Sequence, residues 1–386
     1  MTEWKIPLAD VDIGDEETEA VLQVIRSGWL TMGRCTSKLE GRFAQYHAAG
    51  HAVAVSSGTA ALHLAYAGVG VGPGHEVVMP ALSFVATANA AVACGARPVF
   101  ADIIDCHEPT IDPLHVEALI TPRTRAITVV HYGGYPGRVV ELAELARERG
   151  VALVEDCAHA PGLRVGERYL GTWGTVGCFS FFSNKNMTSG EGGMIVTNDS
   201  ALADRVQRLR SHGMTSGTWK RHHERPQDYD VLEPGWNYRT DEMRSAMALV
   251  QLEKLREGNR RRVALSRLYR ERLGMVPGVG VPFETDPDVT AAHLLPLLTD
   301  GGDLRRGLMA ALADAGVQTS HHYPPMHLFK YYRDRLGYRE GMLPKTERFA
   351  ACEVTLPLYS RMQAADVEYV TDLIGDAVQN MARKRD

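Results

Sequence analysis

The chain has 386 residues, enough for two domains or for one large α/β domain with a smaller one attached. Its formal net charge of -5 gives no electrostatic reason to expect nucleic acid or an anionic membrane as the main partner. No apolar run reaches the roughly 18 residues that span a bilayer, and the N-terminus lacks an apolar export signal. The six cysteines form no CxxC pair. We therefore expect a cytoplasmic protein with reduced thiols.

Helices and strands alternate along the first half of the chain. Amphipathic helices are predicted over residues 16–30 and 37–50. From about residue 50 to about residue 200, short strands that are apolar throughout alternate with helices and end in polar or glycine-rich turns. Strands of this kind are buried on both faces, so the pattern predicts an α/β fold with a largely parallel sheet between two layers of helices.

The second half of the chain changes in character after residue 210. A polar, aromatic segment over residues 211–239 precedes a long predicted helix over residues 240–273. From about residue 275 a proline-punctuated stretch mixes helix and strand signals as far as the C-terminus. We therefore predict a large domain over residues 1–255 and a smaller α+β domain over residues 256–386.

Three segments of the large domain place functional groups at strand ends, where a doubly wound sheet binds ligands. The stretch "SSGT" over residues 56–59 follows a strand and opens a helix, which suits either a phosphate cradle or a plain N-cap. Asp156 ends the apolar run "VALVED", where it needs a partner or caps the next turn. Lys185 follows an aromatic strand and is either a shielded, reactive lysine or a loop lysine paired with Glu191.

Together the three segments meet the needs of one cofactor. Pyridoxal phosphate requires a lysine for its aldehyde, an acidic partner for its pyridine nitrogen and hydrogen-bond donors for its phosphate. A carboxylate beside the ring nitrogen keeps that nitrogen protonated, as the electron sink requires. His159 lies close enough along the chain to face the ring hydroxyl, and Phe84 either stacks on the ring or packs in the core.

Blocks spread over nearly the whole chain resemble the DegT/DnrJ/EryC1/StrS family of pyridoxal phosphate-dependent sugar aminotransferases. These blocks are "PLADVDIGDEE", "SSGTAALHLA", "EDCAHAPG", "SFFSNKNMTSGEGGMIVTND", "GWNYRTDEMRSAMALVQLEKL", "HYPPMHL" and "TLPLYSRM". The resemblance implies the type I aminotransferase fold, with Lys185 in a Schiff base to pyridoxal 5′-phosphate, Asp156 at the pyridine nitrogen and His159 at the ring hydroxyl. It also implies a homodimer with shared active sites. The residues that it implies around the phosphate are Gly58, Thr59, Ser180 and, from the neighbouring subunit, Asn237.

The same resemblance implies a substrate class. The expected reaction moves an amino group from L-glutamate to a keto sugar, with Lys185 as the general base and acid for the proton shift. The "GEGG" turn after this lysine resembles family members that act on nucleotide-linked 4-keto-6-deoxy sugars more than those that act at the 3-keto position. The segment "HHYPP" over residues 321–325 is expected to add polar groups to the substrate pocket.

Other functions are compatible with parts of the same sequence. One branch of the family aminates keto-inositols, and no expected pocket residue excludes this substrate class. A second branch dehydrates sugars but carries histidine in place of the lysine, so Lys185 argues against it. The presence of Lys185, Asp156 and Ser180 argues against a non-catalytic regulatory protein with the same fold. Because the histidine pairs at residues 222–223 and 321–322 lack carboxylate or cysteine partners at suitable spacing, no metal site is expected.

Overall fold

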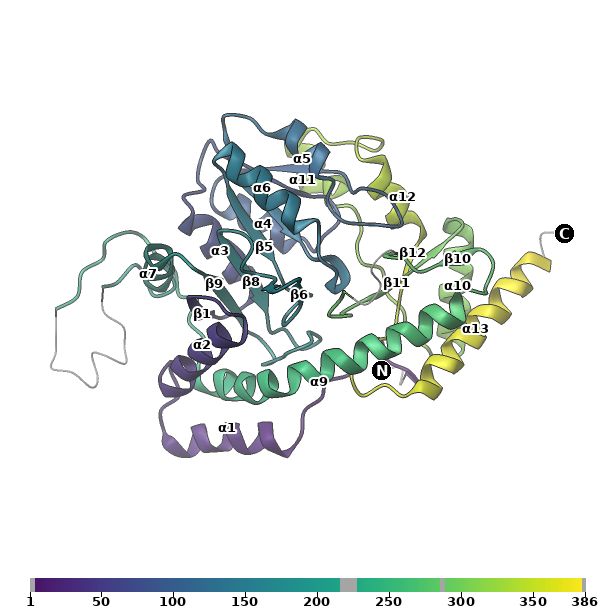
Figure 1. Ribbon diagram of the computed structural model, residues 1–386, viewed down its shortest axis with the longest axis horizontal. Coiled ribbons are helices and arrows are strands. Elements are labelled where there is room, and N and C mark those ends of the chain that lie inside the picture. Colours follow the sequence, from purple (N-terminus) through teal and green to yellow (C-terminus); the bar gives the residue numbers. More distant parts are fainter. Residues whose placement is uncertain (1–3, 216–227, 285–288, 384–386) are drawn as a thin grey trace.

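A seven-stranded sheet forms the centre of the computed structural model, which describes residues 4–215, 228–284 and 289–383 (Figure 1). The strands lie in the order β1-β9-β8-β5-β4-β2-β3. Six of them run in the same direction, and β9 runs in the opposite direction between β1 and β8. This arrangement confirms the predicted, largely parallel sheet. The strands are β1 (His51–Val55), β2 (Glu76–Pro80), β3 (Arg97–Ala101), β4 (Thr124–Val130), β5 (Ala152–Asp156), β8 (Val176–Ser180) and β9 (Gly193–Thr197).

Helices cover both faces of this sheet, which explains why its strands are apolar throughout. Along β1, Val53 and Val55 face one apolar cluster, whereas Ala52 and Ala54 face the other. The first cluster contains side chains from α3 (Gly58–Gly68), α4 (Ala86–Ala93) and α7 (Ser200–Leu209). The second contains side chains from α2 (Arg34–Tyr46), α5 (Pro113–Leu119), α6 (Val139–Arg149) and the first half of α9 (Glu242–Leu273).

The two predicted N-terminal helices are confirmed, with shifted ends. The helix α1 (Asp15–Ser27) ends before residue 30 because Gly28 adopts a left-handed conformation, with φ 71°, and donates its N–H to the carbonyl of Ile25. The helix α2 starts at Arg34 and ends at Tyr46. Within the described ranges, no helix is both long enough and apolar enough to cross a membrane.

The C-terminal part of the chain forms a second, smaller layer of structure. A three-stranded antiparallel sheet, β10-β11-β12, shares an apolar cluster with α10, α13 and the second half of α9. The bounds here are β10 (Val279–Gly280), β11 (Leu295–Thr299), β12 (Glu353–Leu356), α10 (Gly302–Asp314) and α13 (Ala364–Arg383). The connection between β11 and β12 also contributes α11 (Lys330–Leu336) and α12 (Pro344–Cys352), and Tyr332 of α11 returns to the first cluster of the large sheet. A two-stranded hairpin, β6 (Arg164–Val165) and β7 (Arg168–Tyr169), follows β5.

The long helix α9 joins the two parts of the molecule (Figure 1). The predicted domain boundary between residues 255 and 256 falls inside this helix, which continues without a break for 32 residues. Its first half packs in a cluster of the large sheet and its second half in the cluster of the small sheet. The division into residues 1–255 and 256–386 stays a prediction.

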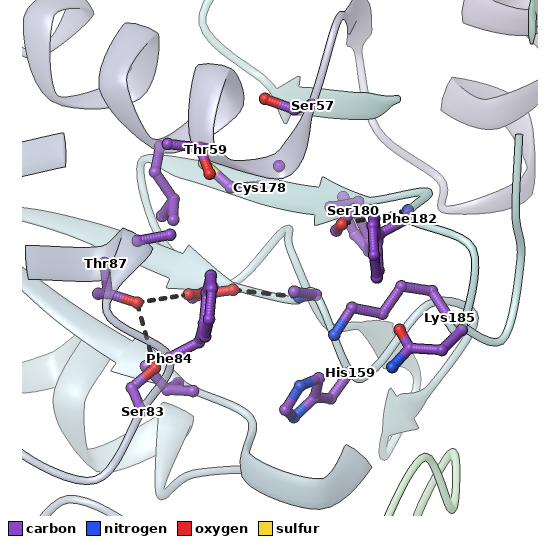
Figure 2. Close-up of a pocket in the computed structure, with 18 of the residues that line it drawn as sticks. Ser57, Thr59, Ser83, Phe84, Thr87, His159, Cys178, Ser180, Phe182 and Lys185 are labelled. Atoms are coloured by element: carbon purple, nitrogen blue, oxygen red, sulfur yellow. Dashed lines mark hydrogen bonds between the residues drawn. The ribbon is translucent and has the colours of Figure 1, made fainter. Parts of the chain in front are cut away.

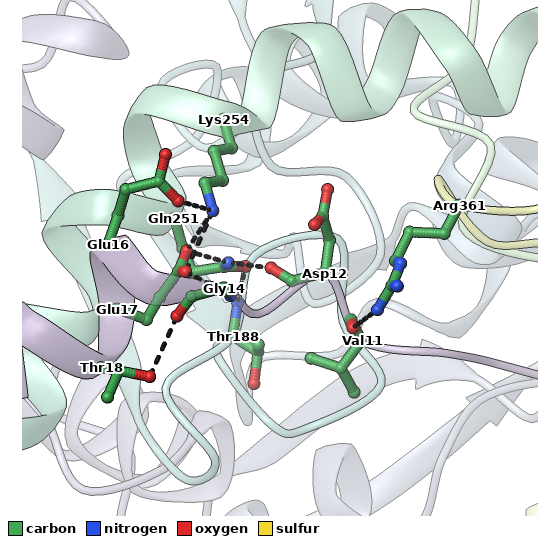
Figure 3. Close-up of polar contacts among 10 residues, drawn as sticks. All are labelled: Val11, Asp12, Gly14, Glu16, Glu17, Thr18, Thr188, Gln251, Lys254 and Arg361. Atoms are coloured by element: carbon green, nitrogen blue, oxygen red, sulfur yellow. Dashed lines mark hydrogen bonds and ion pairs between the residues drawn. The ribbon is translucent and has the colours of Figure 1, made fainter.

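A buried polar network ties α1 to α9 and to the loop that follows Lys185 (Figure 3). Glu17 of α1 has no exposed surface, and its carboxylate accepts from Lys254 Nζ and from Gln251 Nε2 of α9. Burial raises the pKa of Glu17, but these hydrogen bonds outweigh it and hold the pKa below its usual value. The Oε1 atom of Gln251 accepts from the backbone N–H of Thr188 at 3.4 Å. One glutamine side chain therefore contacts both the N-terminal helix and the lysine loop.

Candidate active site

A cavity of about 370 Å³ opens at the carboxyl ends of the parallel strands (Figure 2). Strands β5 and β8 are parallel neighbours, and β1 runs in the same direction because β9 lies antiparallel between β8 and β1. Asp156, Ser180 and the start of α3 therefore meet at one edge of the sheet. The lining combines this edge with the turn after β2, the lysine loop and a C-terminal segment, and it includes Ser57, Gly58, Thr59, Phe84, Thr87, Asp156, His159, Ser180, Phe182, Lys185, Glu191, His322 and Tyr323.

Lys185 extends its side chain into this cavity. Its backbone N–H donates to the carbonyl of Phe182 at 2.9 Å, which closes a tight turn directly after β8. In Figure 2 its amino group lies on the same side of the cavity as His159 and opposite Thr87. Burial lowers the pKa of Lys185 to about 8, while the charge of Asp156 acts in the opposite direction. At neutral pH the amine is still mostly protonated, but its unprotonated, nucleophilic fraction is far larger than that of an ordinary lysine.

The glycines after the lysine are required by close backbone contacts. Gly193 pairs with Val55 on one side and with Ser180 on the other. A Cβ atom at Gly193 would lie 2.6 Å from the carbonyl oxygen of Ser57 and 2.8 Å from that of Phe179. Such contacts are too short for any side chain, so glycine at this position lets β9 bring β8 and the start of α3 together. Gly193 thus has a structural reason that is independent of the substrate.

Asp156 sits at the end of β5 with 6% of its surface exposed. Its Oδ2 accepts from the hydroxyl of Thr87 at 2.9 Å, and its Oδ1 accepts from the backbone N–H of Ala158 at 3.2 Å. Burial raises the pKa of Asp156, whereas these two hydrogen bonds and the charge of Lys185 lower it. A cationic group placed in the cavity would stabilise the ionised carboxylate further. The position is therefore suited to a protonated ring nitrogen.

The "SSGT" stretch forms the start of α3, which confirms the predicted helix N-cap and is compatible with a phosphate cradle at the same place. Ser57 is the N-cap, and its hydroxyl oxygen accepts from the N–H of Ala60 at 3.1 Å. The N–H groups of Gly58 and Thr59 belong to the first turn, where a helix offers no internal acceptor, and both residues line the cavity. Ser180 lies against Gly58 so closely that a Cβ at Gly58 would be 2.8 Å from Ser180 Cβ. This corner has the donors of an anion site, and its role in phosphate binding stays a prediction.

His159 is held between a backbone donor and a tyrosine. Its Nδ1 accepts from the N–H of Gly133 at 3.3 Å, so the proton of the neutral ring lies on Nε2, which is 3.1 Å from the hydroxyl of Tyr323. Burial, together with the charge of Lys185, lowers the pKa of His159 well below its usual value. The ring therefore stays neutral and donates to Tyr323, whose own hydroxyl proton is free to point into the cavity.

Two further predicted site residues differ in their placement. Phe84 lines the cavity and is 58% exposed, and its ring centroid lies 6.1 Å from that of Tyr323. This exposure rules out core packing, the second of its two predicted roles. Asn237 is exposed and is not part of the cavity lining of its own chain. Its neighbours Trp236 and Tyr238 pack against the first apolar cluster and fix the segment beside β1.

Other residues in or beside the cavity differ in how clearly the sequence signals them. Thr87 lies one helical turn from Phe84 in an alanine-rich stretch, and that spacing is the only feature that could have pointed to it. His322 and Tyr323 belong to the "HHYPP" segment, which the sequence places near the substrate. His293 contacts Lys185 from a segment more than a hundred residues away, and no motif surrounds it.

One trio of possible metal ligands occurs among the described residues. Ligand atoms of His131, Glu155 and Cys157 lie within 4.8 Å of one another, fully buried. However, the backbone N–H of Gly137 donates to His131 Nδ1, so Nε2 is the protonated nitrogen and donates to Glu155. The carboxylate of Glu155 also accepts from two backbone N–H groups, at 2.7 Å each. We interpret the trio as a hydrogen-bonded core cluster. The histidine pair at residues 222–223, for which no metal site is expected, lies outside the described residues.

The residues of the cavity fit pyridoxal 5′-phosphate at each end of that molecule. The helix start beside Ser180 offers backbone donors for a phosphate, and the absence of a side chain at Gly58 leaves the space. The buried carboxylate of Asp156 lines the same cavity and suits a protonated pyridine nitrogen. Lys185 and the exposed ring of Phe84 line this cavity as well.

Comparisons with known proteins agree with this site. The model of the DegT/DnrJ/EryC1/StrS aminotransferase family matches residues 11–375. The spore coat polysaccharide biosynthesis protein SpsC of Bacillus subtilis is 37% identical over 381 residues, which are 97% of each chain. The aminotransferase TlmJ from Streptoalloteichus hindustanus superposes with a TM-score of 0.90 at 37% identity, over 97% of this chain and 99% of that one. PseC of Helicobacter pylori, an aminotransferase involved in the biosynthesis of pseudoaminic acid, gives a TM-score of 0.90 at 27% identity over the same shares.

These matches span nearly the whole chain and confirm the type I aminotransferase fold that the sequence predicts. The cofactor of this family is pyridoxal 5′-phosphate, for which the cavity has the required groups. The chain belongs to the DegT/DnrJ/EryC1/StrS aminotransferase family and is a pyridoxal 5′-phosphate-dependent sugar aminotransferase.

Proposed function

We propose that the protein transfers the amino group of L-glutamate to a nucleotide-linked 4-keto-6-deoxy sugar. The observation that carries the proposal is a single cavity that joins Lys185, Asp156 and the start of α3. The names of two relatives, SpsC and PseC, refer to the biosynthesis of carbohydrates. The 4-keto preference rests on the "GEGG" turn and on no contact in the cavity.

The mouth of the cavity suits a sugar. The rings of Phe84 and Phe182 are 58% and 44% exposed, and flat apolar rings commonly cover one face of a ligand in such sites. Hydrogen-bonding groups from Glu191, His322 and Tyr323 line the same cavity. Aromatic surface with a few polar side chains can orient hydroxyl and keto groups of a sugar ring.

In this proposal each predicted residue has a separate role around the cofactor. When bound, pyridoxal 5′-phosphate supplies the electron-withdrawing ring that makes the α-proton of the amino acid acidic. Asp156, held by the hydroxyl of Thr87, keeps a negative charge against the ring nitrogen. Lys185 accepts the α-proton as a general base and returns it as a general acid, a role that suits an amine with a pKa of about 8. Tyr323, whose hydroxyl oxygen accepts from His159, presents its hydroxyl proton to the cavity.

We also propose that two copies of the chain share each active site. The phosphate would be held by Gly58, Thr59 and Ser180 of one subunit and by Asn237 of the other. Support comes from the position of Asn237, which is exposed and lies outside the cavity of its own chain although the segment around it is well packed. All six cysteines are free thiols, which supports a cytoplasmic location.

The proposal is tested by incubating the purified enzyme with L-glutamate and separate keto substrates, and by detecting the aminated product by mass spectrometry. The panel contains nucleotide-linked 4-keto-6-deoxy sugars, nucleotide-linked 3-keto sugars and a keto-inositol. We expect amination of a 4-keto sugar, none with Lys185→Ala, and full activity with Lys330→Ala, which changes an exposed lysine of α11. Amination of the keto-inositol alone would refute the nucleotide-sugar proposal.

A further inference from the structure

Lys185 and His293 approach each other at the wall of the cavity. The Nζ atom of Lys185 lies 3.5 Å from Nε2 of His293. His293 precedes β11, is 6% exposed, and packs on His159 with 4.4 Å between the ring centroids. A neutral histidine can face a lysine with either an N–H group or a lone pair. The position of the ring proton therefore decides what this contact can do.

Two asparagines determine the position of that proton. The Nδ2 atom of Asn186 donates to the carbonyl of Ala291 at 2.7 Å, which fixes the orientation of this amide because a carbonyl can only accept. The same Nδ2 donates to Oδ1 of Asn259 at 2.9 Å, and Asn259 is in turn oriented by its donation to the carbonyl of Pro161. Both amides therefore have a single orientation.

The amide oxygen of Asn186 determines which nitrogen of His293 carries the ring proton. With Nδ2 of Asn186 committed to carbonyl oxygens, its Oδ1 faces Nδ1 of His293 at 2.9 Å. An amide oxygen only accepts, so Nδ1 of His293 carries the ring proton. The Nε2 atom then presents its lone pair toward Lys185.

The backbone that holds His293 is built for this orientation. Ala292 adopts a left-handed conformation with φ 46°, which is unfavourable for a residue with a Cβ atom and tends to occur at functional sites. The turn is held because Ala291 donates to the carbonyl of Gly134, and His293 to that of Gly133, at 2.9 Å each. The N–H of Gly133 also donates to His159. One turn thus orients both histidines.

We propose that His293 is a positioning residue for Lys185, whose amino group donates to the Nε2 lone pair of His293 whenever it is not bonded to the cofactor. This inference rests on the proposed role of Lys185 as the cofactor lysine. A neutral ring is required, and burial, reinforced by the charges of Lys185 and Arg262, lowers the pKa of His293 well below its usual value. The titratable and charged groups that surround the pair are Asp156, His159, Arg262, His322 and Tyr323.

The test measures the pKa of Lys185 in full-length enzyme loaded with pyridoxamine 5′-phosphate, a form in which the lysine is free. Trace labelling with acetic anhydride over a range of pH, followed by mass spectrometry of the Lys185 peptide, gives this pKa without any turnover. Two variants form a matched pair, because the amide of His293→Gln reaches the position of Nε2 and that of His293→Asn only the position of Nδ1.

We expect His293→Asn to lower the pKa of Lys185 by at least about one unit, because an ammonium group loses an acceptor, and His293→Gln to stay near the wild type. Asn186→Ala, which frees the ring proton to move, should lower the pKa by a smaller amount. An unchanged pKa in His293→Asn, or equal shifts in both His293 variants, would overturn the proposal; if the His293 variants do not fold, an unchanged pKa in Asn186→Ala does so. Equal labelling of Lys185 in the pyridoxal and pyridoxamine forms would instead refute its role as the cofactor lysine.

Discussion

Replacing Gly58 by alanine tests the phosphate end of the cavity, because it adds one methyl group at a very tight contact. The new Cβ would lie 2.8 Å from Ser180 Cβ and 3.1 Å from Ser180 Oγ. Carbon atoms in contact normally stay about 3.5–4.0 Å apart, so an overlap of roughly 0.7 Å must be relieved. Ser180 cannot retreat, because it is paired in the sheet with Gly193, which is itself packed against Ser57. The start of α3 must therefore move away from Ser180.

This movement separates the groups that we propose hold the phosphate. Overpacking of this kind costs about 1–3 kcal/mol. If the strain falls on the phosphate site, the dissociation constant of pyridoxal 5′-phosphate rises about 5- to 150-fold, which a fluorescence titration of the cofactor-free protein can measure. Gly72→Ala is the control, because a Cβ at Gly72 meets nothing within 4 Å. Equal affinities for the wild type and both variants would refute the reasoning.

Four other outcomes are expected. Sodium borohydride should attach the cofactor irreversibly to Lys185, and a labelled peptide from any other lysine would contradict the assignment. Asp156→Asn should keep the cofactor but slow both half-reactions by several orders of magnitude in single-turnover assays, since the ring nitrogen loses its charged partner; near-normal rates would leave Asp156 a structural role only. Co-expressed Lys185→Ala and Asn237→Asp chains, each inactive alone, should recover about a quarter of wild-type activity per site through mixed dimers, and no recovery in confirmed mixed dimers would exclude a shared site. Burial raises the pKa of Glu353 from 4.5 to about 8, so stability is lost as pH rises through this window; Glu353→Gln should flatten the loss between about pH 4.5 and about pH 8 in denaturant unfolding, and an unchanged profile would contradict it.

The parts of the site that follow strand ends could be predicted from the sequence. Uniformly apolar strands reveal a sheet that is covered on both faces, and the carboxyl ends of its parallel strands lie on one edge. Asp156 ends β5, and Lys185 lies in the turn that follows β8, so the topology places both at the same edge of the sheet. The glycines after Lys185 were also visible, because tight turns of the backbone restrict the choice of residue.

Residues that reach the site through tertiary packing could not be predicted in this way. His293 and Asn186 meet because a strained turn at Ala292 is held by two glycines of a distant segment, a geometry that leaves no periodic pattern. Thr87 sits in an alanine-rich stretch that reads as helix, and its hydroxyl gains significance only once β5 lies beside it. The predicted helix over residues 240–273 agrees with α9 and already crosses residue 255. A helical pattern does not show which parts of the molecule the helix connects, so the predicted domain boundary fell inside it.

The residues that form the cavity are synthesised at different times. Lys185 leaves the ribosome before Gln251, His293 and Tyr323, which later support its loop, face its amine and close the cavity. At about 5–20 residues per second, the ribosome needs roughly 7–30 s to extend the nascent chain from the lysine to the tyrosine. During that interval the amine is an ordinary exposed lysine, with neither the burial that lowers its pKa nor the histidine that orients it. We therefore expect the cofactor to bind late in the synthesis of this protein, because a chain interrupted before its final quarter contains Lys185 but lacks His293 and Tyr323.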